Sequence, residues 1–551
     1  MSAPTGNFGG SFLLARPETA FSPEQFNEQQ RLIAQTAEEF AQREIVAASE
    51  AIERQEPGVV RALLRQAGEL GLTGVDVPEA YGGAGMDFAA SAIVADHLAV
   101  QGSFSVAFGA HAGIGTLPLV YFGSEEQKRR YLPRLASAEW VAAYALSEAG
   151  SGSDALALRT EAALDPDGSH YRLNGEKMWI SNAGFADLFT VFARTGERVS
   201  AFLVEAGFPG VATGAEEHKM GILGSSTRPL LLREARVPAE NLLGGAGEGA
   251  HIAFQILNVG RFKLGAACIG GARNLLRQAL AYAAQRQAFG QPIASFGLVQ
   301  QLLVEVALRL FAAESAVYRT VGMMEGAKGL DEYAVECSIV KICASEMADV
   351  AVDHAVQVYG GNGFVRGNPA ERAYRDARVN RIFEGTNEIN RLLIPGVLLR
   401  RAEKGQLPLL AAVEQVMGEM LGPAADSDPC EQARKAALLV AGLAFRRHGP
   451  GLAQEQELLA AIADLAIAVY VMQSVAARRP EGTLTRILLA ETLDAVELTA
   501  RRALAALSEG DELRTQLAWL RRLLRREPVD LIRLRRQAAA RLQEAGQYVA
   551  E

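Results

Sequence analysis

Tyr171-Arg-Leu-Asn-Gly-Glu-Lys-Met-Trp-Ile-Ser-Asn182 decides the fold class, because it is β-like in a chain whose other patterns are mostly helical. Asn174-Gly175 is a favoured pair for a two-residue hairpin turn, and strand-forming residues flank it on both sides. Further strand-like runs follow at 188–193, 201–204 and 230–237. Together they predict a small antiparallel β domain between helical blocks, with a hairpin at Asn174-Gly175.

Helical patterns surround this region on both sides. Ser22, Pro23 and Gln25 form a capping-box pattern for a first helix, and helical periodicity continues to about residue 143. It resumes near residue 250 and runs to about residue 400, beyond which Gly and Pro punctuate further helices. We expect a mainly α protein with a central small antiparallel β domain and an extra C-terminal helical domain. The predicted division is a loose N-terminal lead-in (1–20), an N-terminal α domain (21–143), the β domain (144–245), a C-terminal α domain of the core (246–400) and the extra helical domain (401–551).

Composition narrows the class of protein. A net charge of −9 over 551 residues argues against nucleic acid as the main partner. The four cysteines are widely spaced in helical patterns, which favours buried thiols in a reducing compartment. No apolar run is expected to reach the ~20 residues that span a bilayer, and the N-terminus has no secretory signal pattern, so a soluble, cytoplasmic protein is expected. The histidines show no metal-ligand spacing, and His111 on an apolar helical face is typical of a core histidine.

Arg381-Ile-Phe-Glu-Gly-Thr-Asn-Glu-Ile-Asn-Arg391 is the stretch with the clearest chemical potential. Gly385 lets the backbone approach a ligand, and Thr386 is a good N-cap for a helix beginning near Asn387. A carboxylate such as Glu384, flanked by large apolar residues at a turn, is suited to act as a general base. A capped helix with an acidic first turn explains the same residues without any catalysis.

Several other segments suit the binding of a phosphate-bearing, flat ligand. The 145–154 loop offers glycines and serine hydroxyls, but it matches neither a Walker loop nor a Rossmann fingerprint. Trp179-Ile-Ser181 joins an aromatic face to a hydroxyl, and Arg286 at 286–290 could clamp a pyrophosphate. Each segment alone is equally explained by a flexible turn, a core tryptophan or a helix C-cap.

Taken together, in this order and spacing, these segments resemble the acyl-CoA dehydrogenase family over about residues 21–400. The matching pieces are the 78–85 loop, Leu-Ser-Glu…Gly-Ser-Asp (146–154), Lys-Met-Trp-Ile-Ser-Asn (177–182), Asn-Val-Gly-Arg (258–261), Arg-Gln-Ala-Phe-Gly (286–290), Gln-Val-Tyr-Gly-Gly-Asn-Gly-Phe (357–364) and Phe-Glu-Gly-Thr-Asn-Glu (383–388). The additional C-terminal block makes the chain most similar to the very-long-chain branch, which carries an extra helical domain.

The resemblance implies an FAD enzyme that forms a double bond next to the thioester of a fatty acyl-CoA in β-oxidation, and its very-long-chain branch implies a long-chain substrate. Glu384 matches the catalytic base, whose backbone N–H, with a flavin ribityl hydroxyl, would stabilise the enolate oxygen. The positions that match cofactor contacts are Tyr144, Leu146, Ser147, Gly152, Ser153, Trp179, Ile180, Ser181, Arg286, Phe289, Phe296, Gln357, Gly360, Gly361, Thr386 and Glu388. Those that match substrate contacts are Ser153, Asn258, Arg261, Phe383, Glu384 and Gly385; no metal is implied.

The chain departs from the family pattern at a few positions. Ser147 and Ala149 stand where Thr and Pro are usual, and Ala288 replaces a residue that often bears a hydroxyl. In another branch the base directly precedes the arginine that matches Arg261, but here that residue is Gly260, so Glu384 is the candidate that remains. Gly113 and Gly115 could open space for a long acyl chain or allow close helix packing.

Partners and alternatives also follow from the resemblance. It implies an electron-transferring flavoprotein as acceptor, a homodimer, and peripheral contact with the inner membrane face through the arginine-rich final helices. Those arginines could instead pair with acidic neighbours on a solvated face, or contact DNA, which the acidic chain disfavours most. An acyl-CoA oxidase and a non-catalytic FAD-binding assembly protein are the alternative functions.

Overall fold

The computed structural model describes residues 8–419 and 428–550. The chain forms two compact units. The β unit comprises Phe26–Gly271 and Arg372–Asn380, and the helical unit comprises Met1–Gln25, Ala272–Glu371 and Arg381–Glu551. The five-part division expected from the sequence stays a prediction, whereas the mainly α fold with a central sheet and an extra helical C-terminal region is confirmed.

The β unit begins with a helical half. Its elements are α1 (Glu28–Phe40), η3 (Ala41–Ile45), α2 (Ser49–Glu53), α3 (Val59–Glu69), η4 (Glu79–Tyr81), α4 (Phe88–His97), η5 (Leu98–Val100), α5 (Gly102–Phe108), η6 (Gly109–Gly115), α6 (Leu117–Phe122) and α7 (Glu125–Ala136). Phe40, Leu64 and Phe104 belong to the apolar core of this half. The first α-helix does not begin at Ser22 as predicted: Pro23–Gln25 is a 3-10 turn, and Asn27 caps α1 with Gln30 as its capping-box partner.

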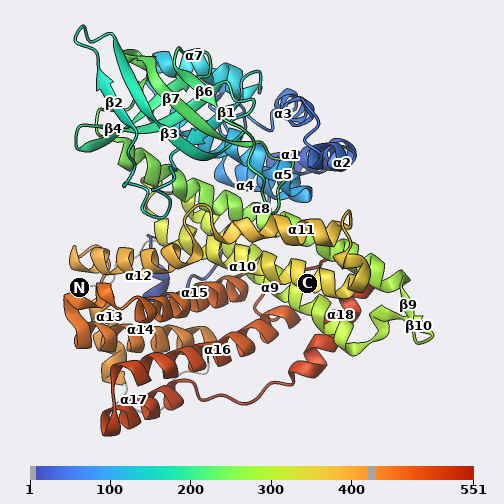
Figure 1. Cartoon of the computed structure of the whole chain (residues 1–551). Coiled ribbons are helices and arrows are strands. Elements are labelled where there is room, and N and C mark those ends of the chain that lie inside the picture. Colours follow the sequence, from blue (N-terminus) through green and yellow to red (C-terminus); the bar gives the residue numbers. More distant parts are fainter. Residues whose placement is uncertain (1–7, 420–427, 551) are drawn as a thin grey trace. The chain divides into compact units, whose positions relative to one another are not determined.

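The sheet of the β unit has the order β6-β7-β3-β2-β4-β5-β8, with β1 parallel to β4 (Figure 1). Its strands are β1 (Ala142–Ala145), β2 (Glu161–Leu164), β3 (His170–Ser181), β4 (Leu188–Thr195), β5 (Arg198–Glu205), β6 (Val211–Thr213), β7 (Thr227–Pro238) and β8 (Leu242–Leu243). The short 3-10 helix η7 (Ala239–Asn241) precedes β8, and α8 (Gly249–Gln285) follows it and runs on into the helical unit. Most pairs are antiparallel, and the three strand-like runs predicted downstream of residue 182 are confirmed as parts of β4, β5 and β7.

The predicted hairpin at Asn174-Gly175 is wrong, because β3 continues through both residues. The strand bulges there against β7, and Asn174 bonds across the bulge, accepting from the backbone N–H of Glu234 at 2.8 Å. Gly175 is required by close approach: a Cβ atom at this position would lie 2.4 Å from the Thr160 hydroxyl oxygen. The turn that joins β2 to β3 lies earlier, where Gly168 N–H donates to the Asp165 carbonyl at 2.9 Å.

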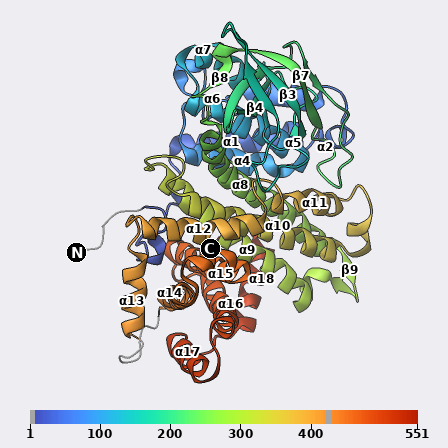
Figure 2. The same cartoon turned by 60° about the vertical axis from the view of Figure 1, so that its left-hand side comes forward.

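The helical unit is built from long helices. They are α9 (Gly297–Met324), α10 (Ala334–Tyr359), α11 (Pro369–Ala377, shared with the β unit), α12 (Asn387–Glu403), α13 (Leu409–Glu419), α14 (Pro429–His448), α15 (Gln456–Arg478), α16 (Thr483–Leu507), α17 (Gly510–Leu523) and α18 (Leu531–Ala545). The short elements are η1 (Ser11–Leu13), η2 (Pro23–Gln25), β9 (Gln287–Ala288), β10 (Gln291–Pro292), η8 (Ile293–Ser295), η9 (Gly360–Phe364), η10 (Arg378–Arg381) and η11 (Gly449–Gln454). Both views show α14, α15 and α16 side by side, and α15 packs on α9 and α12 (Figures 1 and 2).

The predicted loose lead-in is partly built into this unit. Residues 1–7 lie outside the described residues, but Phe12 is 1% exposed and its ring meets Tyr470 of α15 edge-on at 5.1 Å. Gln473 of α15 donates to the Phe12 carbonyl at 2.9 Å, and Arg434 of α14 donates to the Leu13 carbonyl at 3.0 Å. The segment is therefore a buried connection to the extra helical region.

Three helical stretches are long and apolar enough to span a membrane, which corrects the expectation that no apolar run reaches that length. They are Gly102–Phe122, Gly249–Gln285 and Gln456–Arg478. The share of each apolar window that is buried in the folded chain is 72%, 78% and 72%, respectively. Their apolar character is accounted for by the protein core.

Candidate active site

The turn that carries Glu384 has an unusual backbone. It links η10 to α12, and Glu384 and Gly385 have φ angles of 58° and 79°. A left-handed conformation costs a side-chain-bearing residue roughly 1–2 kcal/mol, so the surrounding structure must hold Glu384 in it. Thr386 caps α12 as predicted, and its hydroxyl accepts from the Ile389 N–H at 3.2 Å.

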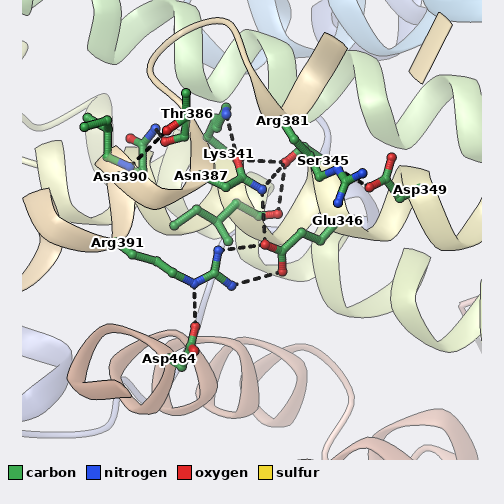
Figure 3. Close-up of polar contacts among 12 residues, drawn as sticks. Lys341, Ser345, Glu346, Asp349, Arg381, Thr386, Asn387, Asn390, Arg391 and Asp464 are labelled. Atoms are coloured by element: carbon green, nitrogen blue, oxygen red, sulfur yellow. Dashed lines mark hydrogen bonds and ion pairs between the residues drawn. The ribbon is translucent and has the colours of Figure 1, made fainter. Parts of the chain in front are cut away.

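Two side chains grip the carbonyl oxygens of this turn (Figure 3). The Asn390 amide donates to the Gly385 carbonyl at 2.8 Å and to the Thr386 carbonyl at 3.1 Å. The Lys341 ammonium, from α10, donates to the same Gly385 carbonyl at 2.8 Å. Both side chains are 0% exposed. Buried donors aimed at the carbonyls fix the turn, and with it the position of Glu384.

Lys341 is itself held by a polar cluster between α10 and α12 (Figure 3). It donates to the Asn387 side-chain oxygen at 2.7 Å, and the Asn387 amide donates to Ser345 and Glu346, each at 3.1 Å. Sequence reasoning missed Lys341, Asn387 and Asn390. A lysine placed directly between the apolar residues Val340 and Ile342 was the available signal, because a buried ammonium needs acceptors.

The other residues that match the family around this turn lie on the same unit. Phe383 and Gly385 are half-buried next to Glu384, whereas Glu388 is exposed in the first turn of α12. The pKa of Glu388 is held below its usual value chiefly by its own backbone N–H, with a smaller contribution from Thr386. An exposed carboxylate at a helix N-terminus is free to turn toward a ligand.

A second cluster, in the β unit, organises the 147–154 loop. The buried Lys177 ammonium lies 2.7 Å from the Glu148 carboxylate and donates to the Leu146 carbonyl at 3.2 Å. Glu148 also accepts from Arg159 N–H at 2.6 Å, and from the N–H and hydroxyl of Thr160 at 3.0 and 2.6 Å. Burial alone would raise the pKa of Glu148, but these donors hold it below its usual range. The pair was not singled out from the sequence.

Backbone contacts tie the loop to the end of β3. The Ser147 carbonyl accepts from Met178 N–H at 2.9 Å, so Ser147 lies beside Trp179 and Ser181 of the same strand. Trp179 has a φ of 57° at an irregularity of the β3–β7 pairing, and its side chain is 55% exposed. Tyr144, Leu146 and Ile180 are buried, and the Tyr144 ring packs on Phe192.

The arrangement fits a bound FAD in the β unit. A large aromatic side chain would normally be buried, so the exposed indole of Trp179 leaves a flat face for a heterocycle. In the adjacent loop, a Cβ atom added at Gly150 or Gly152 would meet no other atom within 4 Å, and Ser153 is exposed. Ser147, Gly152, Ser153, Trp179 and Ser181 are the residues there that would hold the cofactor.

The remaining cofactor positions lie on the surface of the helical unit. Phe289 tips the β9–β10 turn at 94% exposure, with its ring edge-on to Phe296 at 5.9 Å. Arg286, Gln357, Gly360 and Gly361 are also exposed. The two segments are joined where Tyr282 stacks on Tyr359 with ring centroids 4.3 Å apart. This surface offers a guanidinium and open glycines to a phosphate-bearing ligand.

The substrate positions Asn258 and Arg261 lie on α8, one turn apart. Both are nearly buried, and the Arg261 guanidinium donates to the Asn258 side-chain oxygen at 2.8 Å. Next to them, Lys263 pairs with Asp76 at 2.6 Å. The structure thus brings Asn258 and Arg261 together within the β unit, while Glu384 belongs to the helical unit. Within residues 8–419 and 428–550, no cluster of three His, Cys, Asp or Glu side chains suits a metal ion.

Comparison with known families and proteins identifies the chain. Residues 27–139, 143–235 and 247–399 match the N-terminal, middle and C-terminal domains of acyl-CoA dehydrogenases, and 432–522 match a further acyl-CoA dehydrogenase C-terminal domain. A probable acyl-CoA dehydrogenase of Bacillus subtilis is 45% identical over 98% of both chains. The human mitochondrial very long-chain specific acyl-CoA dehydrogenase is 37% identical over 74% of this chain and 68% of its own.

Among solved structures, an acyl-CoA dehydrogenase from Bacillus anthracis, complexed with FAD, superposes with a TM-score of 0.96 and is 44% identical, covering 99% of this chain and 100% of that one. The butyryl-CoA dehydrogenase of Megasphaera elsdenii has a TM-score of 0.65 at 32% identity, covering 68% of this chain and 99% of its own. The chain belongs to the acyl-CoA dehydrogenase family and is an FAD-dependent enzyme of that family.

Proposed function

We propose that Glu384 is the base that removes a proton from the carbon next to the thioester carbonyl of a fatty acyl-CoA, and that long-chain acyl-CoAs are the preferred substrates. The observation that carries this assignment is the left-handed backbone of Glu384, held by the buried donors Asn390 and Lys341. A strained, over-determined turn at a carboxylate is typical of a functional position.

This dehydrogenation removes a proton and a hydride from two neighbouring carbons of the acyl chain. The α-proton passes to the Glu384 carboxylate, a hydride leaves the β-carbon, and the two carbons become joined by a trans double bond. FAD, when bound, supplies the acceptor for that hydride. The backbone N–H of Glu384 is the donor that would stabilise the thioester oxygen as negative charge develops there. Phe383, half-buried beside the base, keeps water away from the carboxylate.

The preference for long chains rests on the relatives and on Gly113. The very long-chain specific relatives match 74% of this chain in human and macaque. A Cβ atom at Gly113 would meet only the Lys263 side chain, at 3.7 Å, whereas one at Gly115 would lie 2.5 Å from the Ala110 carbonyl oxygen. Gly115 therefore serves close packing, and Gly113 is the candidate for admitting an acyl chain.

An anaerobic absorbance titration with acyl-CoAs of graded length tests this function. Bleaching of the flavin band by the long-chain members supports it, and bleaching by short chains alone would contradict the chain-length preference. Glu384→Gln should keep its bound FAD and lose the bleaching. A variant that bleached at the wild-type rate would remove Glu384 as the base. No bleaching of the wild-type protein by any acyl-CoA would favour the assembly-protein alternative, and oxygen uptake without an added acceptor would favour the oxidase.

We also propose an electron-transferring flavoprotein as the acceptor and a homodimer as the working form. Support for the dimer comes from large apolar side chains exposed on the helical unit around β9–β10 and η9: Phe289, Leu298, Phe364 and Val365. Exposed apolar patches of this kind mark protein interfaces. Sedimentation equilibrium of the wild type and of Phe289→Ser tests it, and a monomeric wild type would contradict it.

Peripheral membrane contact and a cytoplasmic location form the last part of the proposal. Many of the C-terminal arginines are paired: Arg535 with Glu305 and Glu491, and Arg526 with Asp494 and Glu497. The surface that we propose for anionic lipid is the exposed side of α18, with Ile532, Arg536 and Arg533, of which Arg533 also pairs with Asp530 at 3.8 Å. Cosedimentation with phosphatidylserine vesicles, lost in Ile532→Ser/Arg536→Ser, tests the contact. Equal sedimentation of the two proteins would contradict it. The net charge of −9 gives no support to nucleic acid as a partner.

A further inference from the structure

The extra helical region touches the polar cluster behind the catalytic turn. Asp464 lies on α15, and its carboxylate accepts from the Arg391 Nε atom of α12 at 2.8 Å. The same guanidinium donates to both oxygens of Glu346 on α10, at 2.7 and 3.2 Å. Arg391 is therefore held from two sides, by the core and by the appended region, in a fork geometry that only arginine provides.

From Glu346 the contacts lead directly to the turn of the base (Figure 3). Glu346 accepts from the Asn387 amide at 3.1 Å, and Asn387 in turn accepts from Lys341 at 2.7 Å. Lys341 donates to the carbonyl of Gly385, the residue that follows Glu384. Every link lies within hydrogen-bond distance. Arg391 uses different nitrogens toward Asp464 and Glu346, whereas Glu346 accepts from both Arg391 and Asn387 through Oε1, and the single Lys341 ammonium donates to both Asn387 and Gly385.

We propose that the extra helical region positions the catalytic base through this relay, which runs from Asp464 through Arg391, Glu346, Asn387 and Lys341 to the Gly385 carbonyl. Arg391 and Asp464 are positioning residues. Neither reaches the turn directly, so each acts by fixing the orientation of the next side chain. The inference rests on the proposed role of Glu384 as the base.

The partial solvent exposure of Asp464 and Glu346 distinguishes a positioning role from a contribution to the stability of the fold. The side chains of Asp464 and Glu346 are 43% and 39% exposed. Ion pairs with such exposure add little to the stability of a fold. A sub-ångström shift of a base, by contrast, changes the rate of proton removal strongly. Loss of Asp464 should therefore affect the reaction more than the folding.

The test compares Asp464→Asn and Arg391→Lys with the wild type as FAD-loaded proteins. Asp464→Asn keeps the shape and loses the charge, and Arg391→Lys keeps the charge but cannot contact both carboxylates. We expect flavin reduction at saturating acyl-CoA to slow by about threefold to tenfold. The half-saturating acyl-CoA concentration and the melting temperature should change little, and amide exchange in the peptide covering 382–391 should become faster.

Asp494→Asn is the matched control, because it removes an ion pair of α16 with Arg526 that does not lead to the turn. It should match the wild type in reduction rate and in exchange of the 382–391 peptide. In an Asn387→Ala background, Asp464→Asn should add no further slowing, since the relay is already interrupted.

Three results would overturn the relay: wild-type reduction and exchange in Asp464→Asn and Arg391→Lys, a fully additive effect in the Asn387→Ala background, or an equal effect of Asp494→Asn. A reduction rate that is normal per FAD-loaded site, with only fewer loaded sites, would also overturn it. Failure of the proposed function has a different signature, because the wild-type protein itself would not bleach. The exchange measurement, which needs no reaction, then decides on the relay alone.

Discussion

The side-chain amide of Asn390 donates to the carbonyl oxygen of Gly385 at 2.8 Å, so the first turn of α12 holds the residue that follows the base. The same amide also lies within 3.1 Å of the Thr386 carbonyl and 3.4 Å of the Glu384 carbonyl. One buried side-chain amide thus lies within hydrogen-bond distance of three successive carbonyl oxygens. Such convergence stabilises a left-handed turn that ordinary helix entry would not adopt.

Asn390→Ala should therefore impair both the fold and the reaction. Removing a buried donor leaves its acceptors unsatisfied, so we expect the free energy of unfolding to fall by about 1–3 kcal/mol. Because the turn loses the hydrogen bonds that hold its carbonyl groups, flavin reduction at saturating acyl-CoA should slow by at least about tenfold. Urea unfolding and anaerobic stopped-flow absorbance measure the two effects.

Asn390→Asp is the informative companion. Its carboxylate would face the same carbonyl oxygens with no proton to donate, so it should be slower than Asn390→Ala despite its closer shape. Equal rates for Asn390→Asp and the wild type would show that the carbonyl contacts do not position the base.

Local patterns in the sequence predicted the parts of this site that depend on neighbours in the chain. Thr386 as the cap of α12 and the strand-like runs within β4, β5 and β7 depend on adjacent residues, and the structure confirms them. Asn174-Gly175 misled the turn prediction, because the glycine is needed for the close approach of Thr160, the residue that precedes β2. No local pattern in the sequence reveals which distant segment lies close to a glycine in the folded chain.

Local patterns could not predict the contacts that hold the turn of Glu384 either, because these contacts also join residues that are far apart in the chain. Lys341 precedes Gly385 by 44 residues and belongs to another helix. Helical periodicity places Lys341 on a mostly apolar face, but it does not say which carbonyl meets the ammonium. Likewise, the chain positions of Arg391 and Asp464 do not disclose that α12 and α15 are packed together.

Lys177→Met should loosen the cofactor loop. The substitution leaves Glu148 buried without its cation, although Arg159 and Thr160 still donate to it. Removing one partner of a buried ion pair lowers the free energy of unfolding by about 3–5 kcal/mol. We therefore expect a lower melting temperature and a loss of FAD on gel filtration. The absorbance ratio of flavin to protein, before and after filtration, measures the loss.

The second partner provides the control for that prediction. In Lys177→Met/Glu148→Gln the stranded charge is gone, and the glutamine can still accept from Thr160, so part of the FAD retention should return. Asn241→Ala removes buried hydrogen bonds to Tyr131 and Leu203 elsewhere in the β unit and should retain FAD. Equal FAD loss in Asn241→Ala would mean that general destabilisation, and not the loop, releases the cofactor.

Glu336 should make the stability of the helical unit depend on pH. Its carboxyl is fully buried and accepts from Gly10 N–H at 2.7 Å, while Arg319 and Arg401 are the cations that favour its ionised form. Burial outweighs these contacts and raises its pKa from 4.5 to about 7. The folded protein then binds this proton more tightly than the unfolded chain, so stability falls as the pH rises from about 4.5 to about 7 and is level above that.

Glu336→Gln isolates this effect, because its side-chain oxygen can still accept from Gly10. At pH 8 the variant should be more stable than the wild type, by up to about 3 kcal/mol, and near pH 5 the difference should be small. Urea unfolding at pH 5, 6.5 and 8 measures both proteins. A difference that does not grow between pH 5 and pH 8 would exclude Glu336 as the titrating group.

Trp179→Ala should weaken FAD binding without weakening the fold. The indole is 55% exposed on β3, so its removal creates no cavity, whereas an aromatic pair contributes about 0.5–1.5 kcal/mol beyond the area it buries. The dissociation constant of FAD should therefore rise about threefold to tenfold, with an unchanged melting temperature of the apoprotein, and Trp179→Phe should restore most of the affinity.

Trp140, whose ring contacts Tyr131 and lies under Arg134, is the contrasting tryptophan: Trp140→Ala should lower the melting temperature and leave the FAD dissociation constant unchanged. Titration of apoprotein with FAD, followed by flavin fluorescence, measures the affinities, and a wild-type dissociation constant in Trp179→Ala would show that the exposed indole does not contact the cofactor.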